Sequence, residues 1–395
     1  MVILRKCVNV LRHMKKPVRI GLVFDTRSVY ARLEVTGVIA YARSLGLPWI
    51  FAGGEGSAET WRMLRRWQPD GIVGAVPPGT LRARIPSVVQ LAPDPAGAVL
   101  LDHAAIGRLA ADHLTERGFR HLAFVGEKGA DWSAGRGEGF QSAWAAKLAT
   151  HPSASFHRLD LALAPVDDWR PALGELVNWL RTLPRPVGIL ACRDLRAREV
   201  AQACQTARLR VPEEVAIVGV DNDDLMCEMT DPPLSSVIVP WDQIGYHMGA
   251  HLHHLLQGHR PPKRLPSVVP TGMQVRRSSD IYAIADKAVA VACRYLRDHI
   301  QEPAQVEEVA RIAGVSRRGL ERRFRHELGR SPHAEIQRLR LERARQLLRE
   351  TSLPLSLIAE RSGWSSVQRF IAAFKIQGGQ TPGQFRLAGK FKPLA

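Results

Sequence analysis

The chain has 395 residues, enough for two or three domains, and its 45% hydrophobic and 24% charged residues are ordinary for a globular protein. No apolar run approaches the roughly 18 residues of a membrane-spanning helix. The five scattered cysteines argue against a disulfide framework or a zinc site, and they favour a reducing, cytoplasmic compartment.

The net charge of +17 is unevenly distributed along the chain. Residues 1–19 hold six basic residues and no acidic one, and residues 281–395 hold 21 basic and 11 acidic residues. The 28 basic and 27 acidic residues of 20–280 nearly cancel. This pattern indicates a sensor or an enzyme joined to a module that binds a polyanion.

The first 16 residues form a basic leader that makes a poor signal peptide, because it has neither an uninterrupted apolar core nor a small-residue cleavage site. Since Met14 comes just before the first predicted strand, a mis-assigned start that includes residues 1–13 is an alternative interpretation.

Residues 17–275 alternate short apolar strands with amphipathic helices. The helix over 105–118, which ends at Gly118, is an example. Strands are predicted at 18–24, 70–76, 86–91, 121–126, 186–192 and 214–220. This alternation predicts an α/β fold with parallel sheets covered on both faces, and its length suits two doubly wound lobes around a cleft.

Residues 276–395 read as helical throughout and contain an internal repeat. Four residues recur 50 positions later: Leu320, Phe324, Gly329 and Pro332 return as Phe370, Phe374, Gly379 and Pro382. We therefore predict an all-α domain with two helix–turn–helix units, at about 306–328 and 355–378, joined by a helix.

The stretch from Gly314 to Pro332 carries six arginines and two glutamates. On a helix, Leu320, Phe324 and Leu328 form one stripe that a core would bury, and the arginines gather on another face. In a helix–turn–helix, such a face enters the DNA major groove. The alternative is a solvated charged face.

Eight residues are the predicted DNA contacts. In the first unit they are Arg318, Glu321 and Arg322 at base edges, with Arg317 and Arg325 at phosphates; in the second they are Ser366, Gln368 and Arg369. Because the second unit is poorer in charge, we expect weaker or less specific base reading there.

This C-terminal region resembles the DNA-binding domain of the AraC/XylS family of transcription regulators. The pattern F-K-x-x-x-G-x-T-P-x-x-F-R is present from Phe374 to Arg386. Two departures, Ala372 in place of the usual arginine and Gly378 in place of a bulky residue, bear on contacts by the second unit.

Polar residues that directly follow predicted strands are candidate ligand contacts, because ligands bind open α/β sheets at the carboxyl ends of the strands. They are Asp25, Asp102, Asp194 and Asp221, with Arg136 in a following loop. Carboxylates and a guanidinium suit sugar hydroxyls, and Tyr30 or Trp132 suits stacking on a sugar ring. Each aspartate has the alternative role of a helix N-cap, and Trp132 that of a packing residue.

Residues 17–275 resemble the periplasmic-binding-protein-like sensors of the LacI/GalR family, through segments such as "LLDHAAIGRLAADHLTERGFRHLAFVG" and "GRGEGF". The resemblance implies that Asp102, Arg136, Asp194 and Asp221 hold sugar. A LacI-like sensor followed by an AraC-type tail resembles the family of xylose operon regulators, in which the segment Tyr30–Arg32 has similar surroundings; this adds Arg32 as a candidate.

These resemblances imply a cytoplasmic, sugar-responsive transcription regulator, with no enzymatic activity, cofactor or metal. We expect an activator and a homodimer that binds operator DNA, a small sugar for which xylose is the leading candidate, and RNA polymerase, but no membrane. The alternatives are a carbohydrate-binding protein and a carbohydrate-active enzyme with an accessory nucleic-acid-binding tail.

Overall fold

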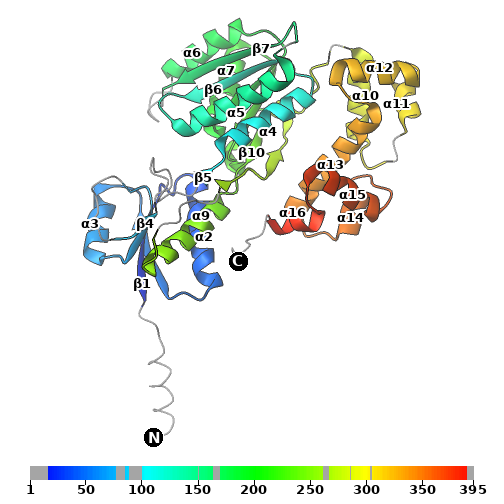
Figure 1. Cartoon of the computed structure of the whole chain (residues 1–395). Coiled ribbons are helices and arrows are strands. Elements are labelled where there is room, and N and C mark those ends of the chain that lie inside the picture. Colours follow the sequence, from blue (N-terminus) through cyan, green and yellow to red (C-terminus); the bar gives the residue numbers. More distant parts are fainter. Residues whose placement is uncertain are drawn as a thin grey trace. The chain divides into compact units, whose positions relative to one another are not determined.

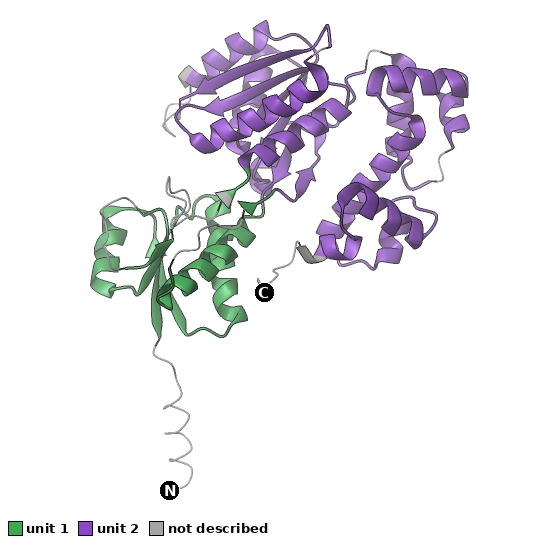
Figure 2. Ribbon diagram, in the orientation of Figure 1, with its two compact units in different colours: residues 1–102, 240–269 green, residues 103–239, 270–395 purple. Residues whose placement is uncertain are grey.

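The computed structural model divides the chain into two compact units (Figures 1 and 2). Unit 1 is 1–102 with 240–269, and unit 2 is 103–239 with 270–395. The structure describes residues 17–76, 85–88, 100–149, 151–162, 170–260, 267–284, 286–302 and 305–388. The predicted leader 1–16 and the last part of the strand predicted at 86–91 lie outside the described residues. Within the described ranges, no helix has the length and apolar character needed to cross a membrane.

Unit 1 contains a parallel four-stranded sheet in the order β2-β1-β3-β4. These strands are β1 (Val18–Val23), β2 (Trp49–Gly54), β3 (Gly71–Gly74) and β4 (Ser87–Val88), and a separate parallel pair joins β5 (Leu100–Leu101) to β11 (Ser267–Val268). Its helices are α2 (Val29–Ser44), α3 (Ala58–Trp67) and α9 (Trp241–Leu256). The backbones of α2 and α9 touch, because a Cβ on Gly37 would lie 2.0 Å from the carbonyl oxygen of Asp242.

Unit 2 contains a six-stranded sheet in the order β12-β10-β9-β8-β6-β7. Its strands are β6 (His121–Glu127), β7 (Ser155–Leu161), β8 (Val187–Ala191), β9 (Val215–Val220), β10 (Ser235–Ile238) and β12 (Gly272–Gln274). All pairs are parallel except β12, which joins β10 in the antiparallel sense.

Helices cover both faces of this sheet (Figure 1). They are α4 (His103–Glu116), α5 (Asp131–Leu148), α6 (Arg170–Thr182) and α7 (Asp194–Ala207), with the short α8 (Asp224–Glu228) after β9. Alternate strand residues such as Val125, Ile189 and Ile217 pack against α6 and α7 in one buried core. Phe124, from the opposite face of β6, meets α5. The near-continuous apolar strands follow from this double burial.

The backbones of α4 and α5 also touch. A Cβ on Gly107 would lie 2.1 Å from the carbonyl oxygen of Arg136, and a Cβ on Gly139 would lie 2.2 Å from that of Ala104. Only glycine fits at these two contacts, so the two helices are fixed closely against each other.

The remainder of unit 2 is helical. Its elements are η2 (Arg277–Ser279), α10 (Lys287–Asp298), α11 (Val306–Ile312), α12 (Arg317–Leu328), α13 (Pro332–Glu350), α14 (Leu355–Arg361), α15 (Val367–Gly378) and α16 (Pro382–Ala388). One core gathers Leu320 and Phe324 on the first half of α13, and a second gathers Phe370 and Phe374 on its second half. The fold-class prediction of an α/β sensor with parallel sheets followed by an all-α domain is confirmed.

Candidate functional site

Three of the predicted ligand contacts converge in unit 2, at the carboxyl ends of its strands. The Arg136 guanidinium, 3% exposed, donates to the Cys192 carbonyl and lies 3.6 Å from a carboxylate oxygen of Asp221. It also lies 5.0 Å from the centre of the Trp132 ring. Its Nε has no hydrogen-bond partner among the described residues. Such a buried donor beside a carboxylate and an aromatic ring suits a polar ligand with an apolar face.

Asp194, another predicted ligand contact, is buried more deeply than Asp221. Its carboxylate is 3% exposed and accepts hydrogen bonds from the Ser236 hydroxyl at 2.6 Å and the Asp223 backbone N–H at 2.8 Å. These bonds hold a turn in which Asp221 has φ 105° and Asn222 has φ 52°, both in the left-handed region. Burial, reinforced by the nearby Asp221 carboxylate, raises the pKa of Asp194 to about 8.

A second charged pair in this region escaped the sequence analysis. Glu127 ends β6, Arg193 follows β8, and their side chains form an ion pair of 3.1 Å. The rule that selected residues after strands points to both, but the prediction took Asp194, one residue beyond Arg193. Among the described residues, no group of three or more His, Cys, Asp or Glu side chains is arranged to hold a metal ion.

Of the four predicted contacts in unit 1, Asp25 and Arg32 both make hydrogen bonds in the loop that follows β1. Asp25 pairs with Arg27 at 2.9 Å, and this hydrogen bond lowers the pKa of the Asp25 carboxyl. Arg32 donates to the carbonyls of Thr26 and Arg27, both at 2.8 Å, so it shapes the loop that follows β1. The Tyr30 ring packs 5.3 Å from that of Trp241, and the Asp102 backbone N–H donates to the Val268 carbonyl at the end of β5.

The first helix pair is α11 with α12, and the second is α14 with α15. The predicted DNA contacts in the first pair include both ion-paired and unpaired side chains. Arg317 bonds Glu321 at 3.0 Å and also pairs with Glu307, so these side chains restrain one another. Arg318, Arg322 and Arg325 are exposed, and no carboxylate of the described chain lies within ion-pair distance of them. These three arginines therefore give α12 a positive outer face.

The second helix pair has the same frame with a different surface. Ser366 is the N-cap of α15 and accepts from the Arg369 backbone N–H at 3.3 Å, as Ser316 accepts from Gly319 at 3.1 Å for α12. Gln368 and Arg369 are exposed, and the Arg369 guanidinium lies 3.3 Å from the Ser365 hydroxyl.

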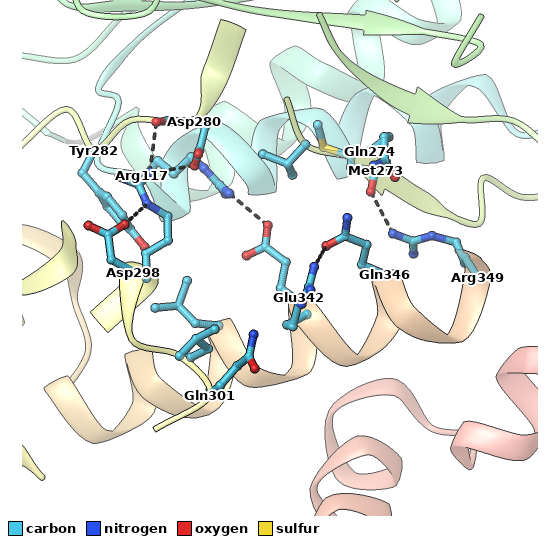
Figure 3. Close-up of a pocket in the computed structure, with 15 residues that line it drawn as sticks. Arg117, Met273, Gln274, Asp280, Tyr282, Asp298, Gln301, Glu342, Gln346 and Arg349 are labelled. Atoms are coloured by element: carbon cyan, nitrogen blue, oxygen red, sulfur yellow. Dashed lines mark hydrogen bonds and ion pairs between the residues drawn. The ribbon is translucent and has the colours of Figure 1, made fainter. Parts of the chain in front are cut away.

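Ion pairs join the end of α4 to α13, the helix between the two helix–turn–helix units. Arg117 donates to Glu342 at 2.9 Å, and Arg338 lies 3.4 Å from Glu116 and 2.9 Å from Glu342. Figure 3 shows Arg117 and Glu342 facing each other in a pocket of about 350 Å³, with Arg349 bonded to the Met273 carbonyl. Within unit 2, the sheet domain and the helical domain thus meet through specific ion pairs.

Glu335, near the start of α13, is completely buried. It accepts from the Tyr282 hydroxyl at 2.6 Å and from Arg338 at 2.9 Å, and it also pairs with Arg330. Burial raises the pKa of Glu335, but Arg338 and Arg330 outweigh burial and bring the pKa to about 2. This carboxylate is therefore charged at neutral pH.

Comparisons with known proteins agree with this arrangement. Residues 111–279 match the periplasmic binding protein-like domain family, and residues 309–388 match a helix-turn-helix domain family. The xylose operon regulatory protein of Escherichia coli K12 is 31% identical over 383 residues, which cover 93% of this chain and 96% of the relative. That of Haemophilus influenzae is 29% identical over 390 residues, which cover 93% and 98%.

A solved structure described as the xylose-binding transcription activator XylR is 29% identical, with a TM-score of 0.56 and coverage of 95% of this chain and 99% of that one. The predicted combination of a sugar sensor with an AraC-type tail is confirmed by these relatives. The chain therefore belongs to the family of xylose operon regulatory proteins, and it is a sugar-responsive, DNA-binding transcription regulator and not an enzyme.

Proposed function

We propose that this regulator responds to a small pentose, with xylose as the leading candidate, and that it activates an operon for pentose use. The observation that carries the proposal is the group of Trp132, Arg136 and Asp221, because its buried guanidinium keeps an unused donor and an aromatic ring lies beside it. The names of the relatives from Escherichia coli and Haemophilus influenzae, and of the solved activator, support xylose.

Each residue of the group has a proposed role. Arg136 and Asp221 bond sugar hydroxyls, and Trp132 packs on the ring face. Asp194 supports Asp221 by holding its turn, and the pair of Glu127 and Arg193 extends the polar surface. Asp25, Tyr30, Arg32 and Asp102 stay predictions for unit 1.

The test is thermal unfolding of the full chain against xylose, arabinose, ribose, glucose and galactose. A ligand that binds only the folded state stabilises it by about 2.7 kcal/mol at 100 times its dissociation constant. We expect xylose to raise the midpoint most. Asparagine at position 221 keeps the size of the side chain and tolerates a positive φ. The Asp221→Asn variant should therefore unfold at the same midpoint as the unchanged protein without sugar, and xylose should no longer raise that midpoint. A midpoint that no sugar moves would contradict the proposal.

On the DNA side, we propose a cytoplasmic homodimer whose four helix–turn–helix units bind operator DNA and present the protein to RNA polymerase. Sugar binding shifts the population of sensor arrangements, and the ion pairs between α4 and α13 pass this change to the helical domain. Linkage then requires that sugar and DNA strengthen each other's binding by one factor. Measuring operator affinity with and without xylose tests this coupling, and measuring xylose affinity with and without operator should give the same factor. An operator affinity that xylose leaves unchanged, or a monomer in sedimentation, would contradict the proposal.

A further inference from the structure

The outward stripe of α15 differs in chemistry from the equivalent stripe of α12. Residues four apart on a helix are offset by only about 40°, so each stripe faces one direction. Because the second copy follows the first at an offset of 50 residues, the two stripes correspond position by position. Arg318, Arg322 and His326 on α12 correspond to Gln368, Ala372 and Ile376 on α15, and all six are exposed.

Ile376 is the most notable member of the α15 stripe. At 86% exposure, it is the most exposed large hydrophobic side chain among the described residues. A single exposed hydrophobic residue is ordinary on a protein surface. This one, however, lies on the stripe that carries positive charge in the first copy, whereas the core of the second copy uses Phe370 and Phe374 on the opposite side of α15.

The two stripes suit different bases. Arginine bonds guanine bidentately at O6 and N7, whereas glutamine bonds adenine at N6 and N7, and apolar side chains contact the methyl group of thymine. The α15 stripe has one glutamine and two apolar residues but no cation. Arg369 and Lys375, exposed beside the stripe, suit phosphates.

We propose that α15 reads an A·T subsite, with Gln368 on adenine and Ala372 and Ile376 against thymine methyl groups, whereas α12 reads a guanine-containing subsite through Arg318 and Arg322. The inference rests on the proposed binding of both helix pairs to DNA, and it adds which bases each pair selects. The lack of cations on the α15 stripe thus changes which bases the helix selects and does not merely weaken its binding to DNA.

The experiment begins by selecting sites for the full-length chain from a pool of randomised duplexes. We expect enriched sites with two unlike subsites, one containing guanine and one rich in A·T. In the best site, each thymine of the A·T subsite is then replaced by deoxyuridine, which lacks only the 5-methyl group. Each contacted methyl removed should weaken binding about fourfold, the equivalent of about 0.8 kcal/mol.

Variants assign the effect to residues. The Ile376→Ala variant should bind the thymine site more weakly and lose the sensitivity to deoxyuridine at one position. Because Ile376 is exposed, the variant should fold normally, and circular dichroism verifies this. Ala372→Arg, which places the side chain of Arg322 in the second copy, should change the preference at one base pair from A·T to G·C. As the matched control, Arg322→Ala should lose the guanine preference while keeping the sensitivity to deoxyuridine.

Three outcomes overturn the inference while DNA binding stands: guanine enriched in both subsites, deoxyuridine without effect, or Ile376→Ala with unchanged deoxyuridine sensitivity. The last would show that Ile376 does not contact the thymine methyl groups. If no sequence is enriched at all, the inference falls together with the proposed binding of operator DNA.

Discussion

The two helix pairs of the C-terminal domain share a frame but not an exterior. Both use a buried phenylalanine at the same place, Phe324 or Phe374, and both have a serine N-cap at the start of the outer helix and a left-handed glycine after it. Outside this frame they diverge: α12 carries five arginines and two glutamates, whereas the charged residues of α15 are only Arg369 and Lys375.

The two pairs also differ at a position in the helix that follows each outer helix. The position that holds the buried carboxylate of Glu335 in the first copy holds Phe385 in the second, where its ring packs 5.4 Å from that of Phe374. Glu335 belongs to the cluster of Arg330 and Arg338, and both of these arginines also contact Glu116 of α4. The duplicated core therefore preserves a fold, and the first copy has in addition an ionic connection to the sensor that its counterpart lacks at this position.

The largest effects should come from the shared cores. Phe324→Ala and Phe374→Ala each remove a side chain that is 0–1% exposed, and each should cost about 3–5 kcal/mol in the free energy of unfolding of its own helix pair. Hydrogen exchange of α12 and α15 amides in the full chain measures this pair by pair. Ile376→Ala is the exposed control and should change stability by less than about 0.5 kcal/mol. Equal loss of protection in both pairs would show that they unfold as one unit.

Low pH should destabilise the first helix pair more than the second. The pKa of Glu335 is lowered to about 2 from a usual 4.5, so its contribution is present above about pH 4.5 and is lost as the pH falls towards 2. A change of this size corresponds to about 3 kcal/mol. Stability of the first pair should fall with acid, and Glu335→Gln should reduce the slope and destabilise the pair at pH 7. An equally steep slope in the second pair, with Phe385 at this position, would contradict the assignment.

DNA affinity should depend mainly on α12. Arg322→Ala should cost about 1–3 kcal/mol and relax specificity at one base pair. Arg325→Ala should weaken all sequences alike and reduce the dependence of affinity on salt by about one phosphate contact. Since Arg317 is paired with Glu321 and Glu307, Arg317→Ala should have a smaller effect than either; a larger one would place Arg317 on DNA. Fluorescence anisotropy between about 50 and 200 mM salt distinguishes these cases.

The smallest effects should come from the caps. Ser316→Ala and Ser366→Ala each remove one capping hydrogen bond and should each cost about 1 kcal/mol, whereas Ser→Asp should retain most stability. The midpoint of thermal unfolding measures both. Clearly unequal costs would mean that the two frames are less alike than their geometry indicates.

Local patterns in the sequence were sufficient to predict much of this molecule. Alternating apolar strands and helices predicted the sensor, and the repeat with its Arg-rich face predicted the helix pairs, because periodicity and capping act over a few residues. The partners of individual charges were not predictable. Asp194 bonds Ser236, 42 residues away, and Glu335 bonds Tyr282, 53 residues away. Such contacts exist only once the chain has folded, so residue type alone did not reveal the structural role of Asp194.

The glycine contact between α4 and α5 has a mechanical consequence. With backbones in direct contact at Gly107 and Gly139, neither helix can slide past the other, so a displacement of α5, which carries Arg136, must tilt α4 as a rigid rod. A helix of 14 residues is about 21 Å long, so a tilt of about 5° moves its far end by about 2 Å. That end carries Glu116 and leads into Arg117, whose guanidinium is bonded to α13. In the proposed mechanism, leverage of this kind would carry a small movement at a sugar bound near Arg136 to the ion pair between Arg117 and Glu342.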